Sequence, residues 1–125
     1  MTTDNVKASI ELAIKYHKEK LLPDELERYT EVVALIRDRA DLQGGPLWYL
    51  AYYNRGVCYN DLDKFAKAID DFKTVLAQLP NDGDTKKELR FAERSLLLDA
   101  RDAALVEKYD PLSLDDVLRI DLAAL

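Results

Sequence analysis

One stretch of the sequence, residues 56–80, sets small and aromatic side chains at intervals that suit two packed helices. Gly56 and Ala68 present almost no side chain, so the helices that carry them can approach each other closely. Three aromatic side chains large enough to fill the adjoining gaps occur nearby: Tyr59, Phe65 and Phe72. Pro80 ends the second helix, because proline cannot continue one. The stretch therefore predicts a tightly packed helical hairpin.

Apolar residues recur at three- and four-residue steps along most of the chain, as they do in amphipathic helices. No window shows the β-branched alternation that is typical of a strand, so we expect an all-α chain. The predicted helices cover 4–20, 23–41, 46–60, 64–79, 85–108 and 114–124. The short turns between them favour three antiparallel hairpins in a single domain over residues 1–125.

Proline, glycine and capping residues mark the predicted helix boundaries. Pro23, followed by two acidic residues, suits a helix start, and Gly-Gly-Pro at 44–46 ends one helix and begins the next. Thr85 and Glu88 are spaced as a capping box, in which each side chain bonds the other residue's backbone N–H. We therefore expect the fifth helix to start near Thr85.

The composition excludes several classes of function. The net charge of −6 and the pI near 4.8, without a run of basic residues, disfavour nucleic acid as a partner. No apolar run approaches the roughly 20 residues of a membrane span. Cys58 is the only cysteine, and the N-terminal residues lack the pattern of a secretion signal. A cytoplasmic protein with no membrane association is expected.

From Tyr49 to Asp82, the sequence follows the pattern W-x-x-L-G-x-x-Y, then A-x-x-x-F, then P. This segment resembles a tetratricopeptide repeat, with Tyr52 in place of the usual tryptophan. The residues that carry the resemblance are Tyr52, Gly56, Tyr59, Phe65, Ala68, Phe72 and Pro80. Arg55 stands where a leucine is usual, and we expect its aliphatic stem to lie along the hairpin with the guanidinium outside.

The hairpins on either side do not show this signature, and we interpret them as divergent or capping hairpins. A single repeat leaves apolar faces uncovered, and about three are needed for stability. The resemblance therefore implies a short solenoid of stacked hairpins.

Tetratricopeptide domains are non-catalytic scaffolds that bind peptides or helices in a concave groove lined by the first helix of each repeat. By that resemblance, five residues would face the groove: Leu50, Tyr53, Asn54, Val57 and Asn60. Asparagine side chains can bond a peptide backbone as donor and acceptor, and tyrosine offers rigid contact area. The alternative is a solvated helix face without a ligand.

Some members of the family clamp a peptide's C-terminal carboxylate with Lys, Asn and Arg side chains from successive repeats. Asn54 occupies the position of the middle asparagine, and Lys86 and Arg90, four residues apart, could supply the distal cations. Ile10 and Ile14 fall near the places where the first helix would need lysine and asparagine. Ordinary solvated charges are the favoured interpretation of Lys86 and Arg90.

No motif in the sequence predicts catalysis, a cofactor or a metal site. His17 is the only histidine and lies on an apolar stripe, so we expect it to be packed. Cys58 has no nearby histidine in sequence, which favours an unreactive, partly buried thiol. The acidic pair at 70–71 is interpreted as solvated charge.

The expected function is that of a protein-interaction module, an adaptor or co-chaperone, that binds a segment of another protein and is not an enzyme. The alternative is a structural protein that dimerises through its C-terminal helix at 114–124 or through the edge of the solenoid. That helix could cap the solenoid or lie in a groove of its own or a neighbouring molecule.

Overall fold

The computed structural model of the protein describes residues 3–108, with side chains described for 5–101. Within that range lie five α-helices and one 3-10 helix: α1 (Thr3–Lys18), α2 (Leu22–Ile36), η1 (Ala40–Leu42), α3 (Pro46–Asp61), α4 (Phe65–Gln78) and α5 (Gly83–Lys108). The prediction of an all-helical fold is confirmed for these residues. The helix expected at 114–124 lies outside them.

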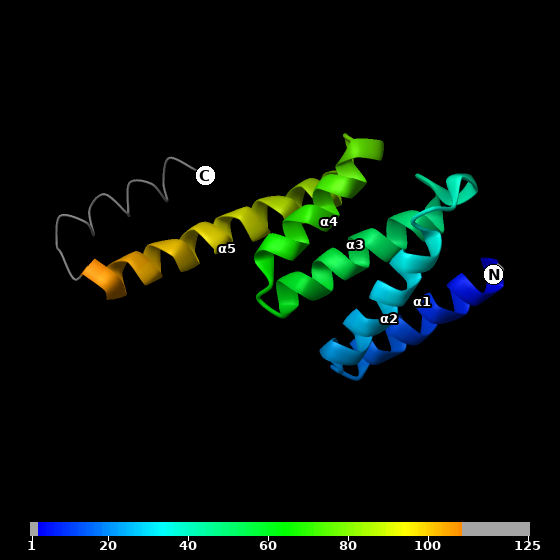
Figure 1. Ribbon diagram of the computed structural model, residues 1–125, viewed down its shortest axis with the longest axis horizontal. Helices are drawn as coiled ribbons and strands as arrows, with labels where there is room; N and C mark the ends of the chain where they lie inside the picture. The colour runs from blue at the N-terminus through cyan, green and yellow to red at the C-terminus, as the bar shows by residue number, and fades with distance from the viewer. Residues whose placement is uncertain (1–2, 109–125) are drawn as a thin grey trace.

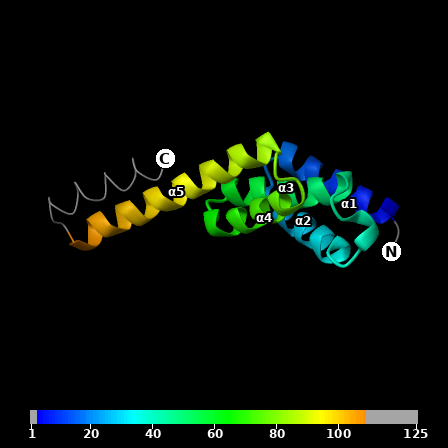
Figure 2. The ribbon, with the colours of Figure 1, turned by 90° about the horizontal axis from the view of Figure 1, so that it is seen from above.

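The helices are stacked in chain order (Figure 1). Each helix packs mainly against the helix before it and the helix after it, with smaller contacts between α1 and α3 and between α3 and α5. Consecutive packing of this kind is the arrangement of a helical-hairpin solenoid. The 26-residue α5 is much longer than the 14-residue α4, and Figure 2 shows it extending well beyond the α3–α4 hairpin.

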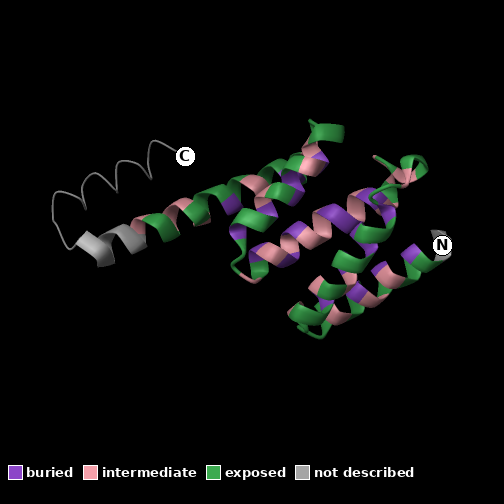
Figure 3. Cartoon of the chain, in the orientation of Figure 1, coloured by how far each residue is buried: buried purple, intermediate pink, exposed green. Residues whose placement is uncertain are grey.

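Two apolar clusters share α3, and Figure 3 shows buried residues, in purple, along this helix. The larger cluster joins α1, α2 and the first half of α3 with Val75 of α4. Trp48 is almost fully buried in this cluster, and its ring centroid lies 5.2 Å from that of Tyr52. The smaller one joins α4 and α5 around the buried residues Phe72 and Ala92, with the second half of α3 packed on it. Because both clusters use α3, this helix holds the two ends of the solenoid together.

The α3–α4 hairpin depends on a close approach at Gly56. A Cβ atom placed on this glycine would lie 2.5 Å from Phe72 Cε1 and 2.8 Å from Phe72 Cζ, which is too close for any real contact. Phe72 and Ala68 are fully buried on the facing helix. The small and aromatic residues of the sequence pattern therefore interlock across the hairpin, as steric reasoning suggests.

Arg55 departs from the prediction that its guanidinium lies outside the hairpin. Arg55 Nε and Nη2 donate to the two carboxylate oxygens of Asp71 on α4, at 2.8 and 2.6 Å, and the Arg55 side chain is only 17% exposed. The guanidinium also lies over the rings of Tyr52 and Tyr59, 5.8 and 5.6 Å from their centroids. A buried ion pair thus takes the place of an apolar contact.

Asp71 is accordingly not the solvated acid that the sequence suggested. Its side chain is 4% exposed. Burial raises the pKa of this carboxyl, and the hydrogen bonds and charge of Arg55 oppose that rise. The neighbouring Asp70 is exposed, as expected.

Two helix boundaries differ from the prediction for local reasons. Helix α2 ends at Ile36 rather than near residue 41, because Gln43 Nε2 donates to the carbonyls of Ile36 and Arg37, at 3.4 and 3.0 Å. These bonds satisfy acceptors that a helix end leaves unpaired. Gly44 then turns the chain at a φ of 73°.

The start of α5 is capped by Asp82, so the predicted capping box of Thr85 and Glu88 is wrong. Asp82 Oδ2 accepts hydrogen bonds from the Thr85 backbone N–H at 3.1 Å and from Thr85 Oγ1 at 2.5 Å. The Tyr49 hydroxyl donates to the same oxygen at 3.0 Å. Asp82 therefore links α3 to the first turn of α5, and the Thr85 bonds hold its pKa below the ordinary range.

Candidate functional site

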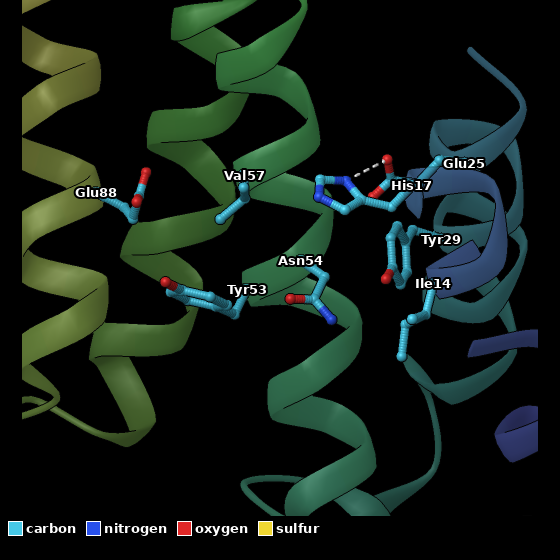
Figure 4. A pocket seen from close by; sticks show the side chains of 8 residues that line it. All are labelled: Ile14, His17, Glu25, Tyr29, Tyr53, Asn54, Val57 and Glu88. Carbon is cyan, nitrogen blue, oxygen red and sulfur yellow. Dashed lines mark hydrogen bonds and ion pairs between the residues drawn. The ribbon is translucent and has the colours of Figure 1, made fainter. Parts of the chain in front are cut away.

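A hollow of about 200 Å³ lies along one side of α3, between the α1–α2 hairpin and α5 (Figure 4). Tyr53, Asn54 and Val57 contribute its α3 side, which is possible because positions four apart share a face of a helix. The residues that define this α3 hollow are Ile14, His17, Glu25, Tyr29, Tyr53, Asn54, Val57 and Glu88. The structure thus brings together three of the seven predicted groove residues.

Figure 4 shows how the flanking helices close the two sides of the α3 hollow. Ile14 and His17 of α1, with Glu25 and Tyr29 of α2, lie on one side of Asn54, whereas Tyr53 and Glu88 lie on the other. The Tyr53 ring stacks on the Tyr49 ring, with centroids 5.2 Å apart and an angle of 14° between the ring planes. The hollow therefore combines an aromatic surface with polar groups on both sides.

His17 is the residue whose predicted environment differs most from the observed one. We expected it to be packed, but its side chain is 52% exposed, and its Nδ1 lies 3.0 Å from Glu25 Oε1. Glu25 is the buried partner, with a side chain that is 4% exposed. Burial raises the pKa of the Glu25 carboxyl, and the contact with His17 only partly offsets this effect.

Tyr29 forms the wall of the hollow beside Glu25. Burial, assisted by the Glu25 charge, raises the pKa of Tyr29 to about 12, and the amide of Asn54 opposes this rise. At neutral pH the Tyr29 hydroxyl is thus a neutral hydrogen-bonding group. Asn54 and Tyr29 thus contribute neutral polar groups to the lining of the hollow.

Asn60 does not face a groove as predicted, because it is 5% exposed and belongs to the contact between α3 and α5. Asn60 Nδ2 donates to Glu88 Oε2 at 3.2 Å and lies 3.4 Å from the Glu88 carbonyl oxygen. Its Oδ1 is buried and has no hydrogen-bond partner among the described residues. Asn60 thus orients Glu88, and Glu88 is the residue that reaches the hollow.

The other three predicted groove residues are found elsewhere. Leu50 is half-buried against the larger apolar cluster. Lys86 and Arg90 are exposed on α5 and are not among the residues that line the α3 hollow. The hollow contains two carboxylates, Glu25 and Glu88, where a carboxylate clamp would need cations.

Cys58 lies on the buried side of α3 and takes no part in the hollow. It is fully buried, and its Sγ donates to the Leu22 carbonyl at 3.4 Å. Burial, followed by the charge of Glu25, raises the pKa of this thiol to about 12. A thiol in that environment stays protonated and is a poor nucleophile.

Sequence reasoning missed five residues of the hollow: Ile14, His17, Glu25, Tyr29 and Glu88. One signal was present, since Glu25 and Glu88 each precede a buried residue by four positions, Tyr29 and Ala92. Both acids therefore fall on inward-facing stripes of their helices. The sequence pattern indicates both acids only as residues of a helix start.

Neither a metal site nor a membrane helix is found in the part of the chain that the structure describes. No three side chains of histidine, cysteine, aspartate or glutamate gather there closely enough to hold a metal ion. None of the helices in that part combines the length and the apolar character needed to cross a bilayer.

Consecutive helices packed as antiparallel hairpins define the class of helical-repeat proteins. Within this class, the family model of the tetratricopeptide repeat matches residues 49–82, which contain most of α3 and all of α4. The match confirms the resemblance of this segment and indicates a protein–protein interaction module, a class that is generally non-catalytic. No curated protein and no solved structure among those compared matches the chain.

Proposed function

We propose that the protein is an adaptor or co-chaperone that binds a segment of a partner protein in the α3 hollow. The observation that carries this proposal is the position of Tyr53, Asn54 and Val57. They line a hollow on the first helix of the matched repeat, between two flanking helices. Side chains of this kind offer a rigid aromatic surface and an amide that both donates and accepts hydrogen bonds. A peptide or a helix of the partner would be the ligand.

The test compares partner capture by the wild-type chain and by variants of the hollow. Purified, tagged protein is incubated with a lysate of the source organism, and the retained proteins are identified by mass spectrometry. The double variant Tyr53→Ala, Asn54→Ala removes the aromatic surface and the amide. Asn54→Arg fills the hollow and leaves the stacking of Tyr53 on Tyr49 in place.

The matched control replaces the same two residue types outside the hollow, as Tyr16→Ala with Asn81→Ala. Circular dichroism verifies that every variant is folded. We expect specific partners to be lost from both hollow variants and to be retained by the control. Retention of every partner by both hollow variants would overturn the proposal.

Self-assembly is the alternative function. It rests on the C-terminal helix expected at 114–124, outside the described residues, and on the edge of α5, where Phe91 and Leu96 are 52% and 42% exposed. Light scattering on the full chain separates the two functions. A monomer would favour the interaction module, and a dimer that Phe91→Ser with Leu96→Ser abolishes would favour self-assembly.

A further inference from the structure

The charges around the α3 hollow are unbalanced. Two of its eight lining residues, Glu25 and Glu88, carry carboxylates, and none is lysine or arginine. The only cationic candidate among them is His17, whose Nδ1 is already directed at Glu25 Oε1. A ligand that enters this hollow therefore meets acceptors and negative charge, in a chain whose net charge is −6.

Glu88 is the carboxylate best placed to meet a ligand. It is half-buried, and Asn60 Nδ2 fixes one of its oxygens from α3 at 3.2 Å. An ionised carboxylate only accepts hydrogen bonds, so a ligand that brings donors to Glu88 would be favoured.

An aromatic ring accompanies this carboxylate. Tyr53 and Glu88 lie on the same side of the hollow in Figure 4, away from the pair formed by His17 and Glu25. Stacking on Tyr49 and the tilted contact with Phe72, at 6.1 Å between centroids, restrain the Tyr53 ring. A cation placed against such a ring gains a cation–π interaction in addition to its ion pair.

The chain already satisfies a similar set of groups elsewhere with an arginine of its own. Arg55 lies over two tyrosine rings and donates two hydrogen bonds to the buried carboxylate of Asp71. A planar guanidinium suits both neighbours at once, since it stacks on rings and binds a carboxylate through two parallel bonds. Tyr53 and Glu88 offer a ring and a carboxylate in the hollow, with no arginine lining it.

We propose that the α3 hollow binds a cationic side chain, in the first place an arginine, carried by the partner segment, with Glu88 as its ion-pair partner and Tyr53 as its aromatic surface. This inference rests on the proposed function, because it assigns a chemistry to the segment that the hollow receives. It predicts that basic segments are selected and that acidic C-terminal peptides are rejected.

The probe is N-acetyl-arginine amide, titrated into the ¹⁵N-labelled full chain and followed by NMR. N-acetyl-citrulline amide is the matched control ligand, because citrulline has the shape of arginine without its charge. We expect saturable shifts centred on Tyr53, Asn54 and Glu88 with the arginine compound, and binding about five-fold weaker with citrulline, as for a partly screened ion pair. Added salt should weaken only the arginine titration.

Glu88→Gln is the test variant, because glutamine keeps the size of the side chain and an oxygen that can accept the bond from Asn60. Glu93→Gln on the same helix removes an exposed carboxylate that does not line the hollow. Glu88→Gln should reduce arginine binding to the level of citrulline, whereas Glu93→Gln should leave it unchanged. Equal binding of arginine and citrulline, or full binding by Glu88→Gln, would overturn the inference.

The two proposals fail in different ways. If lysate partners depend on Tyr53 and Asn54 but Glu88→Gln retains them, the groove function stands and the cationic ligand is wrong. If no partner depends on Tyr53 and Asn54, the groove function itself fails.

Discussion

Replacing Gly56 by alanine should destabilise the protein, although alanine is the better helix former. The new Cβ would lie 2.5, 2.8 and 3.0 Å from three ring atoms of Phe72. Phe72 is fully buried, so its ring cannot move into solvent, and α3 and α4 must separate instead. Overpacking of this kind costs about 1–3 kcal/mol, and the gain in helix propensity returns about 1 kcal/mol. We expect a net loss of up to about 2 kcal/mol in the free energy of unfolding.

Urea unfolding followed by circular dichroism measures this loss, and Gly83→Ala is the matched control. Gly83 is also helical, but a Cβ placed there meets nothing within 4 Å, so stability should be unchanged or slightly raised. A second control repeats Gly56→Ala in the Phe72→Leu background, where the closest ring atoms are absent and the cost should shrink. If Gly56→Ala unfolded at the wild-type urea concentration or above it, the steric argument would be refuted.

Three further predictions concern buried polar groups. Arg55→Leu leaves the Asp71 carboxylate buried and unpaired, so it should cost about 3 kcal/mol at neutral pH in urea unfolding. The raised pKa of Asp71 means that ionisation of this buried carboxyl opposes folding. The cost of Arg55→Leu should therefore fall as the pH is lowered and the carboxyl becomes protonated. A cost that did not change with pH would contradict this argument. Asp82→Asn keeps an oxygen that can accept the Thr85 bonds and removes the negative charge at the start of α5, so it should cost about 0.3–1 kcal/mol. Because the pKa of Asp82 is lowered, the charge contributes its stability at pH values above 3.8, and this contribution is lost as the carboxyl is protonated in acid. A difference from wild type that persisted in acid would contradict the charge effect. Cys58 should react with a thiol reagent at mildly alkaline pH far more slowly in the native state than in denaturant, since its pKa is about 12; equal rates would show that the thiol is accessible.

Helix positions could be predicted from the sequence because they follow from local physics. Periodicity located all five described helices, and Pro23 and Pro46 lie in the first turns of α2 and α3 as expected. The boundaries that were missed depend on side chains that act at a distance. Gln43 reaches back to the end of α2, and Asp82 receives a hydrogen bond from Tyr49, 33 residues earlier.

The α3 hollow could be predicted only in part. The repeat pattern indicated the face of α3 that carries Tyr53 and Asn54, because the spacing of a repeat fixes that face. The walls depend on how α1, α2 and α5 pack against it, and these helices lack the repeat signature. The charge of the hollow could not be predicted, because burial of Glu25 and orientation of Glu88 by Asn60 are tertiary effects.

Arg55 shows the limit of reasoning from a family pattern. At a position where leucine is usual, the pattern alone suggests weaker packing. The compensating partner, Asp71, lies 16 residues away on the facing helix. Either charge alone would be buried without a partner, and each is the partner of the other across the hairpin. A single sequence gives no means of pairing them.

The division of the apolar core along α3 also determines what optical probes can detect. Trp48 is the only tryptophan and belongs to the cluster formed by α1, α2, α3 and Val75 of α4. Its fluorescence therefore monitors mainly this cluster and does not directly report the cluster around Phe72 and Ala92, whereas circular dichroism averages over every helix. A gap between the two melting curves would measure how weakly α3 couples the two clusters, and coincident curves would show that the clusters unfold as one cooperative unit.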